Sequence, residues 1–309
     1  MTCPKVTIIV PIYNGETHLR ETIDSLLSQS FGDFELLAVD DGSTDASSAV
    51  VQSVKDDRIR LIRKENSGLC NTLNLGIAEA KSQFIARSDQ DDISAPQRLA
   101  RQLEVMSENP DAVGVFSYNS KVGSRHTWSN ADKLSMTGAQ VRHYEPEKDG
   151  CLLCSTMFAR ASVLKSIGGF RQPYYPADDF DLELRLAQAG KVMVVQEPLV
   201  AYRFHAGAST YRKSVFTDVP DKCSWAVDSY ERRARSIREL TFQEFMSSQP
   251  NGFWSDLAKR RMNIARLSMR VAGQRFLDGR YIAGAAHLAV GATLDPLGMV
   301  GRTKRYLGA

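Results

Sequence analysis

The fold class follows from residues 6–12, which read Val-Thr-Ile-Ile-Val-Pro-Ile. Apolar and polar residues do not alternate here, and such a run is typical of a strand that is buried on both faces. Strands of that kind occur in parallel sheets, because helices then cover both sides of the sheet. Residues 6–12 therefore predict the centre of an α/β sheet.

Further strands and helices alternate after this run as far as residue 116. Apolar runs predict strands at 34–39, 59–62, 84–86 and 112–116. Apolar residues at three- and four-residue spacing predict helices around 19–27, from a cap at Ser43 or Thr44 to about 54, over 69–80, and from Pro96 to about 106. This alternation indicates right-handed βαβ units and a mainly parallel sheet.

Polar and acidic residues follow three of the predicted strands. The segments concerned are Tyr13-Asn14, Asp40-Asp41 and Asp89-Gln-Asp91. Parallel α/β sheets bind their ligands at the carboxyl ends of the strands. We therefore expect a polar binding site at this edge of the sheet.

Asp89 and Asp91 are two carboxylates separated by one residue at a strand end. Such a pair can approach one Mg²⁺ or Mn²⁺ ion, which prefers oxygen ligands and often shares its coordination with substrate phosphates. A cation held there would neutralise a departing diphosphate. The alternative is a solvated acidic turn, and the second acidic strand end at the same edge favours the functional interpretation.

The segment from Asp40 to Asp45 also has two interpretations. Asp, Gly and Ser suit a turn followed by a helix cap. A carboxylate at the same place can instead accept a hydrogen bond from a base N–H or a ribose hydroxyl. By itself the motif does not separate these two roles.

Residues 119–150 are polar and lack a period, which predicts a long variable loop. Regular structure is then expected to resume, with helices at 160–167 and 179–189, a turn at 168–170, and strands at 192–195 and 199–204. Cys151 and Cys154 have the spacing of a metal or redox pair. Their apolar flanks, and the lack of a second pair at zinc-finger spacing, favour buried core cysteines instead.

The chain has 309 residues, of which 43% are hydrophobic and 24% are charged, and its net charge is +3. This composition excludes global disorder and allows one large domain or two ordinary ones. Five scattered cysteines do not suggest a disulfide framework, and the first residues do not resemble a secretory leader. A cytoplasmic location is therefore expected.

Charge is distributed unevenly along the chain. Residues 1–221 hold 24 Lys and Arg against 29 Asp and Glu, whereas residues 222–309 hold 15 against 7. We therefore expect an α/β domain over residues 1–220 and a basic helical region over residues 221–309.

The basic region has three interpretations. Its arginines can form solvated helix faces, attach to an anionic inner-membrane surface, or bind nucleic acid; the last is disfavoured because no pattern of stacking aromatics accompanies the charge. Residues 281–300 are apolar but interrupted by His287, Asp295 and Pro296. They predict a packing or interfacial helix rather than a membrane span.

Several short motifs stand in a fixed order along the chain. The first four are Pro11-Ile-Tyr13-Asn14-Gly15, Asp40-Asp41-Gly42-Ser43-Thr-Asp45, Asn66-Ser-Gly68 and Asp89-Gln-Asp91-Asp92. The later ones are Pro96-Gln-Arg98-Leu99, Gly168-Gly169-Phe170, Asp178-Asp179 and Tyr202-Arg203-Phe-His205. Over residues 4–210 this combination resembles family 2 glycosyltransferases of the GT-A fold. The resemblance implies a Rossmann-like, mainly parallel mixed sheet flanked by helices.

The resemblance also assigns roles by position. The residues that match nucleotide-binding positions are Pro11, Tyr13, Asn14, Asp40, Asp41, Asn66, Gly68, Asn71 and Asp89, with Asp41 facing the base. Asp89 and Asp91 match the metal and diphosphate motif, and His205 matches a position that can complete the metal site. Asp179 matches the general base, and Asp178 stands before it where the family usually has Glu.

The implied activity is an inverting, metal-dependent transfer of one sugar from a nucleotide sugar, with UDP as the expected nucleotide and Mn²⁺ or Mg²⁺ as cofactor. The expected acceptor is a hydroxyl of a glycan or lipid-linked saccharide in bacterial-type surface polysaccharide or glycoconjugate synthesis. The sequence lacks the Q-x-x-R-W motif of processive synthases, and its first turn lacks the Gly-rich pattern of pyrophosphorylases and dehydrogenases. A non-catalytic sugar-nucleotide sensor or scaffold is the alternative, against which the joint presence of Asp89, Asp91, Asp179 and His205 argues.

Overall fold

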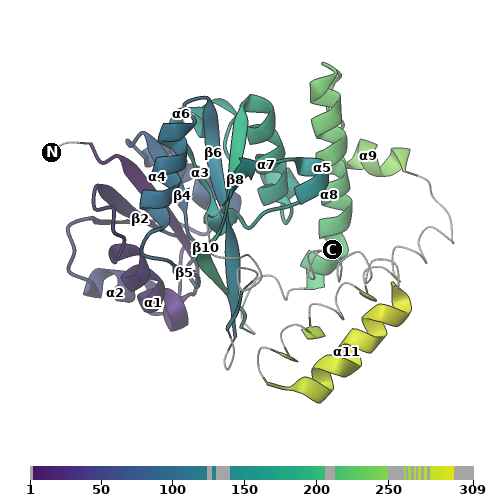
Figure 1. The fold of residues 1–309 in the computed structure, drawn as a ribbon, viewed down its shortest axis with the longest axis horizontal. Coiled ribbons are helices and arrows are strands. Elements are labelled where there is room, and N and C mark those ends of the chain that lie inside the picture. The colour runs from purple at the N-terminus through teal and green to yellow at the C-terminus, as the bar shows by residue number, and fades with distance from the viewer. Residues whose placement is uncertain are drawn as a thin grey trace. The chain divides into compact units, whose positions relative to one another are not determined.

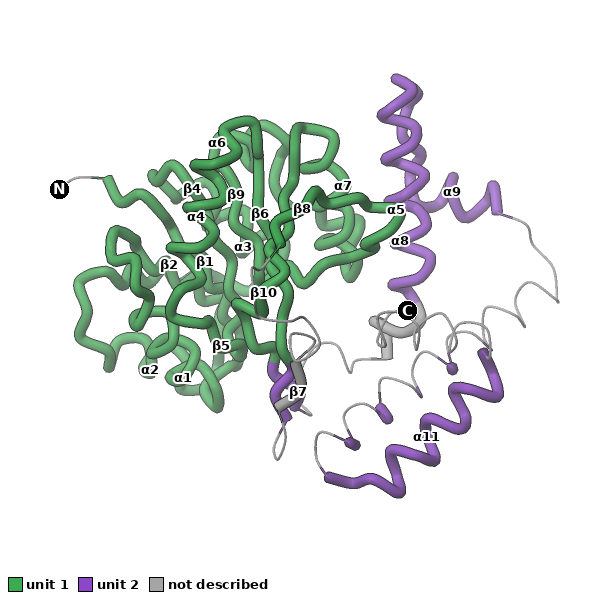
Figure 2. Tube along the Cα trace, in the orientation of Figure 1, with its two compact units in different colours: residues 1–120, 135–202 green, residues 121–134, 203–309 purple. Residues whose placement is uncertain are grey.

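The computed structural model describes residues 3–123, 127–129, 140–205, 213–249 and 279–295, and separate residues between 261 and 276. The chain forms two compact units, unit 1 from residues 1–120 and 135–202 and unit 2 from residues 121–134 and 203–309 (Figure 2). Residue 220, where the sequence places the domain boundary, lies inside helix α8 (Lys213–Ala234) of unit 2.

Unit 1 is built on a mixed sheet that is flanked by helices (Figure 1). The strand order is β3-β2-β1-β4-β9-β6-β10-β5. The strands are β1 (Val6–Ile12), β2 (Phe34–Asp40), β3 (Ile59–Arg63), β4 (Phe84–Arg87), β5 (Ile93–Ser94), β6 (Ala112–Val122), β8 (Val141–His143), β9 (Phe158–Arg160) and β10 (Lys191–Arg203). The first four in the spatial order pair in parallel, whereas β9 is antiparallel to β4 and β6. The expected α/β class with a parallel central sheet is confirmed.

Helices cover both faces of this sheet. The core on one face includes side chains of α1 (Glu16–Leu27), α2 (Ser47–Ser53) and α4 (Arg98–Glu108). The core on the other face includes side chains of α3 (Leu69–Glu79), α6 (Ala161–Ser166) and α7 (Asp178–Ala189). The shorter helices are α5 (Pro146–Asp149) and the 3₁₀ turns η2 (Cys154–Thr156) and η3 (Gln172–Tyr174).

β1 shows why its sequence does not alternate. Ile8, Val10 and Ile12 belong to the core on one face of the sheet, and Ile9 belongs to the core on the other. All four are at most 1% exposed. Because both faces are buried, every position along the strand favours an apolar side chain.

The expectation of an irregular segment at 119–150 is wrong for the residues that the structure describes. β6 continues to Val122, β7 covers Thr127–Ser129, and β8 pairs antiparallel with β10; residues 124–126 and 130–139 lie outside the described part. The two strands expected at 192–195 and 199–204 form one strand, β10. These strands are stabilised by partners distant in sequence, which a local pattern does not reveal.

Two smaller expectations also need correction. Helix α2 begins at Ser47, and neither Ser43 nor Thr44 caps it; Asp45 accepts the Ser47 N–H at 2.9 Å instead. Of the two cysteines expected in the core, Cys154 is buried but Cys151 is exposed.

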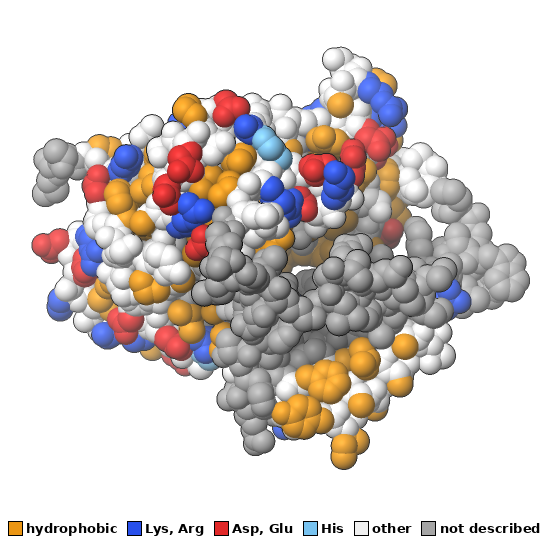
Figure 3. Space-filling view, viewed as in Figure 1, with side chains coloured by type: hydrophobic (Ala, Val, Ile, Leu, Met, Phe, Trp, Pro, Cys, Tyr) orange, Lys and Arg blue, Asp and Glu red, His pale blue; other side chains and the backbone are white. Residues whose placement is uncertain are grey.

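Unit 2 contains helices α8, α9 (Phe242–Ser248) and α11 (Tyr281–Leu294), as expected of a helical extension. Hydrophobic side chains gather over α11, where Ile282 is 90% exposed (Figure 3). Within the described part of the chain, none of the helices combines the length and apolar character that crossing a bilayer requires.

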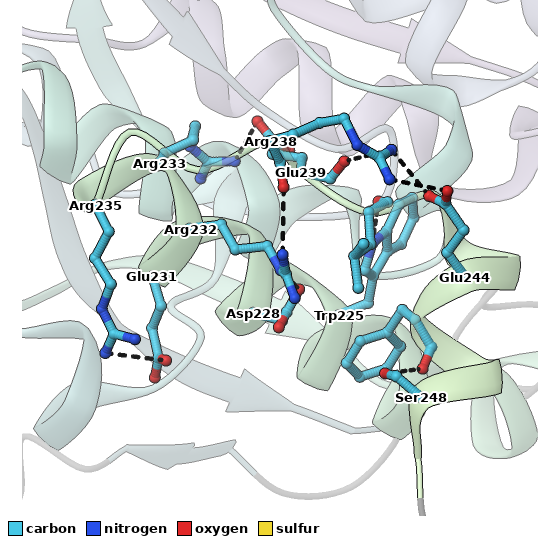
Figure 4. Close-up of polar contacts among 12 residues, drawn as sticks. Trp225, Asp228, Glu231, Arg232, Arg233, Arg235, Arg238, Glu239, Glu244 and Ser248 are labelled. Carbon is cyan, nitrogen blue, oxygen red and sulfur yellow. Dashed lines mark hydrogen bonds and ion pairs between the residues drawn. The ribbon is translucent and has the colours of Figure 1, made fainter.

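Four arginines of this unit lie beside carboxylates of the same unit (Figure 4). The pairs are Arg232–Asp228, Arg233–Glu239, Arg235–Glu231 and Arg238–Glu244, at 2.7, 3.1, 3.8 and 2.9 Å. Their charge is therefore partly balanced locally. Arg235 and Arg238 are exposed, as solvated faces require, whereas Arg232 and Arg233 are partly buried.

Candidate active site

The carboxyl ends of β1, β2 and β4 and the N-termini of α3 and α7 meet at one edge of the unit 1 sheet. Asp41, after β2, accepts the Gly68 N–H before α3. Arg87, the last residue of β4, binds Asp179 at the start of α7. Segments far apart in the sequence are thus joined by direct hydrogen bonds at the edge where the site was expected.

Asp41 is 4% exposed, and its carboxylate is held by the turn before α3. It accepts the backbone N–H groups of Ser67 and Gly68 at 2.8 and 2.9 Å and pairs with Lys64. Burial alone would raise the pKa of this carboxyl, but the Lys64 ammonium and the two N–H donors hold the pKa below its usual range. Asp41 is therefore an ionised group in a fixed position.

The predicted nucleotide-loop residues shape this turn through backbone contacts. Asn66 Nδ2 donates to Asp41 O, and Asn71 Nδ2 donates to Ser67 O, each at 2.9 Å. Gly68 has φ +89°, a conformation that L side chains rarely adopt. The two asparagine side chains and Gly68 therefore determine the conformation of the turn before α3.

Asp40, another predicted nucleotide ligand, is fully buried and holds its own loop together. Its carboxylate accepts the Ser43 N–H at 2.9 Å and binds the Ser48 hydroxyl. Asn14 joins the same loop to the end of β1, because its Oδ1 accepts the Thr44 N–H at 2.9 Å.

The side chains of β1 differ in accessibility at this edge. Pro11 is buried within the strand. Tyr13 is 43% exposed, so its ring is accessible at the edge of the site.

In the turn Asp89-Gln-Asp91-Asp92, the first and last carboxylates differ in burial. Asp89 is half-buried and pairs with Arg87 at 2.9 Å. Burial and the negative charges of Asp91 and Asp179 raise the pKa of Asp89, although Arg87 opposes the shift. Asp92 is fully buried and accepts a hydrogen bond from the Ser155 hydroxyl at 2.6 Å, so it anchors the turn to the interior of the protein.

Arg87 is a residue of the candidate site that the sequence motifs did not indicate. It is 3% exposed, and it donates to Asp89 Oδ1 through Nε at 2.9 Å and to Asp179 Oδ1 at 2.6 Å. Its guanidinium also lies over the Phe170 ring, 5.5 Å from the centroid. The available signal was a single cation at the end of an apolar strand, directly before an acidic motif.

Asp178 and Asp179 open helix α7 and differ in exposure. The Asp179 side chain is 34% exposed, whereas Asp178 is 3% exposed. Burial and the Asp179 charge raise the pKa of Asp178 to about 7, against the influence of Arg87 and of the Cys70 thiol. Asp178 Oδ2 is buried without a hydrogen-bond partner among the described residues. Asp179 is therefore the accessible carboxylate of the pair.

A family model of glycosyl transferase family 2 matches residues 7–168, which is more than half of the chain and includes β1, β2, β4 and the Asp89–Asp92 turn. The chain belongs to glycosyl transferase family 2. It is therefore a glycosyltransferase, and the resemblance read from its motifs is confirmed.

Curated relatives agree with this assignment. The Bacillus subtilis (strain 168) protein named "Putative glycosyltransferase EpsE" is 32% identical over 230 residues, which cover 69% of this chain and 77% of the relative. An uncharacterized glycosyltransferase of Rickettsia felis is 28% identical over 81% of this chain, but the match spans only 41% of that relative's length.

Solved structures of similar fold include S. aureus TarS residues 1–349, in complexes with UDP and with UDP-GlcNAc. The UDP-GlcNAc complex has a TM-score of 0.60 and 17% identity, and the match covers 96% of this chain and 92% of TarS 1–349. This likeness supports the GT-A fold of the family 2 enzyme.

Of the residues predicted to bind a metal ion in this family 2 enzyme, two are carboxylates of the same turn, Asp89 and Asp91. Among the described residues, the structure contains no group of three or more His, Cys, Asp and Glu side chains able to hold a metal ion. Asp89 and Asp91 fit Mg²⁺ or Mn²⁺ as two hard oxygen donors whose mutual repulsion a cation would relieve. His205 follows β10 and belongs to unit 2, and its role as a metal ligand stays a prediction.

We expect Asp178→Asn to change how stability depends on pH. The folded Asp178 keeps its proton up to about pH 7, whereas its ordinary pKa is 3.8, so folded wild type holds a proton that the unfolded chain has lost. Wild-type stability should therefore fall as pH rises through this window, by up to roughly 1.4 kcal/mol per pH unit from this group. Asparagine does not titrate. The Tm of the variant should rise relative to wild type between pH 5 and pH 8, measured without divalent cations.

The exposed Asp111 provides the control for this measurement. Asp111→Asn makes the same chemical change at a side chain that is 68% exposed, so any pH dependence common to both variants can be subtracted. A Tm difference for Asp178→Asn that stays constant with pH after this subtraction would show that Asp178 is ionised throughout.

Proposed function

We propose that the protein transfers a sugar from a UDP-sugar to a hydroxyl group of a glycan or lipid-linked saccharide with inversion. The observation that carries the proposal is the bridge from Asp89 through Arg87 to Asp179. The bridge supports a site in which Asp89 lies next to the leaving group, Asp179 lies next to the acceptor, and the two carboxylates are neighbours. A single displacement at one carbon needs this arrangement.

In the proposed reaction the acceptor oxygen forms a bond to the anomeric carbon as the bond from that carbon to the diphosphate oxygen breaks. The diphosphate leaves with the electron pair. Asp179 takes the acceptor proton, because it is the accessible carboxylate of its pair and Arg87 orients it. Asp178, its neighbour in the chain, is only 3% exposed and is therefore not accessible to an acceptor.

The nucleoside is proposed to bind between Tyr13 and the turn at Asn66–Gly68. Tyr13 offers an exposed ring, and Asp41 offers a carboxylate held in place by three donors. A carboxylate has about four lone-pair sites, so Asp41 can still accept a base N–H. The TarS complexes with UDP and UDP-GlcNAc favour uracil as the base.

Asp89 and Asp91 are the residues that would hold Mn²⁺ or Mg²⁺. When bound, the cation would neutralise the charge that develops on the leaving diphosphate. Arg87 contributes a permanent positive charge beside Asp89. With only two protein carboxylates, the coordination would be completed by phosphate oxygens and water, as is common for Mg²⁺.

The exposed apolar residues of α11 and the excess positive charge of residues 222–309 support a further element of the proposal, contact with an anionic membrane surface on the cytoplasmic side. Such contact would bring the enzyme to a lipid-linked acceptor. The local ion pairs of Arg232 and Arg235 limit how much of this charge is available.

The test is UDP binding with and without Mn²⁺, followed by turnover with UDP-sugars. We expect Mn²⁺ to increase UDP affinity in the wild type and Asp91→Ala to reduce the affinity in Mn²⁺ at least tenfold, because one of two metal ligands is lost. Affinity without Mn²⁺ should change little. Calorimetric titration and thermal shift report both values.

Asp111→Ala is the matched control, since it removes a carboxylate from an exposed position outside the site. Equal loss of affinity with and without Mn²⁺ in Asp91→Ala would contradict the metal role. Tight UDP binding without turnover on any donor would favour the sensor or scaffold.

A further inference from the structure

We infer that Gln90 is a positioning residue that fixes the Asp89–Asp91 turn against the end of β1. It thereby sets the spacing between the nucleoside side and the diphosphate side of the site. The inference rests on the proposed function, which defines these two sides. The motifs assign no role to Gln90, the residue between the two acidic ones.

The Gln90 amide makes two hydrogen bonds with the backbone of one residue. Tyr13 N donates to Gln90 Oε1 at 2.9 Å, and Gln90 Nε2 donates to Tyr13 O at 3.1 Å. A primary amide presents its donor and acceptor in a fixed relation, so this pairing restrains direction as well as distance. Gln90 thus ties the acidic turn to the backbone of Tyr13. Tyr13 itself follows β1 directly, and its neighbour Asn14 is held by Thr44, so the nucleoside side has restraints of its own.

Neighbouring residues are adapted to this arrangement. A Cβ at position 15 would overlap the Gln90 amide, so Gly15 is needed for the close approach. Asn14 has φ +47°, in the left-handed region that Asn tolerates best after Gly. Thr22 of α1 donates from its hydroxyl to Gln90 O at 3.0 Å. The turn is therefore tied to both β1 and α1.

The position of Gln90 makes this restraint relevant to binding. Asp89 and Asp91 are its chain neighbours, so a movement of the turn relative to β1 displaces both carboxylates relative to the nucleoside side. UDP with a metal ion uses both sides at once, and its affinity depends on their spacing. Uridine uses only one side. A positioning role therefore lowers the affinity for UDP with a metal ion but not for uridine, whereas a general loss of stability lowers both affinities.

The experiment uses Gln90→Met in the full chain. Methionine has a similar length and still packs over Gly15, but it makes neither hydrogen bond. We expect the affinity for UDP with Mn²⁺ to fall about five- to tenfold, as for two lost hydrogen bonds. The affinity for uridine without metal, measured by NMR titration, should stay within twofold. Gly15→Ala, which displaces the amide by steric overlap, should show the same pattern.

Gln29 offers a matched control. Its Oε1 accepts the Leu99 N–H at 3.0 Å and its Nε2 donates to Ala95 O at 2.8 Å, so it too joins two segments through backbone hydrogen bonds. Gln29→Met should lower the Tm of the protein and leave the ratio of the two affinities unchanged.

Three outcomes count against the inference in different ways. Parallel loss of uridine and UDP affinity in Gln90→Met, or unchanged UDP affinity in Gln90→Met and Gly15→Ala, overturns the inference and leaves the proposed function intact. A wild-type protein that binds no UDP with Mn²⁺ overturns the proposed function, and the inference with it.

Discussion

Asp179→Asn is expected to lower the turnover of sugar transfer by about a thousandfold, within the range typical of a general base, while UDP affinity stays within twofold. Asparagine has nearly the same shape as aspartate, and its Oδ1 can still accept the hydrogen bond that Arg87 makes at 2.6 Å. The amide cannot take the proton of the acceptor hydroxyl. The change therefore removes the proton acceptor and preserves the geometry around it.

Release of UDP from a UDP-sugar in the presence of an acceptor measures this effect, and calorimetry measures UDP affinity. Glu197→Gln is the matched control, because Glu197 also pairs with an arginine, Arg101, at 2.9 Å. It should retain nearly full turnover. Turnover of Asp179→Asn within tenfold of wild type would exclude Asp179 as the base and direct attention to Asp178.

Arg87→Met is expected to reduce the free energy of unfolding by about 3 kcal/mol, the lower end of the usual cost of breaking a buried ion pair, because the two carboxylates left behind are partly exposed. Arg87 is 3% exposed and bridges Asp89 and Asp179. Without it, the carboxylates of Asp89 and Asp179 repel each other with no cation between them. Unfolding in urea should show the loss directly, and Tm should fall by roughly 10 °C.

A double-mutant cycle identifies the cause of this loss. Arg87→Met combined with Asp179→Asn should be more stable than Arg87→Met alone, by about 1–3 kcal/mol, because one unpaired carboxylate is then neutral. Arg160→Met is the control, since Arg160 donates to the carbonyl oxygens of Ala112 and Pro110. If Arg87→Met costs no more than Arg160→Met, the bridge contributes little to stability.

Much of the parallel half of the sheet could be predicted from the sequence. The predicted strand at 6–12 matches β1 at both ends, and the helix predicted at 69–80 differs from α3 by one residue. These segments carry patterns that span neighbouring residues. β8 and β9 could not be predicted in the same way, because three-residue strands carry almost no periodic signal and depend on their partners.

The position of the candidate residues was predictable to a similar extent. The strand ends placed Asp41 and Asp89 at one edge, and the family resemblance added Asp179. The structure joins Asp89 to Asp179 through Arg87. The motifs did not show that Asp40 and Asp92 are fully buried supports of their turns. Acidic residues in a motif look alike in the sequence, and only their depth in the fold shows which are accessible and which are buried supports.

The sequence by itself determined the α/β class, the family and the identity of the residues at the strand ends, because burial of a strand and the chemistry of a turn depend on adjacent residues. The tertiary structure alone decided that Arg87 binds Asp179, 92 positions away, and that Asp178 has a raised pKa. Ion pairing and loss of solvation depend on distances through space. These distances are set only when the sheet forms, so they cannot be read from the order of residues in the chain.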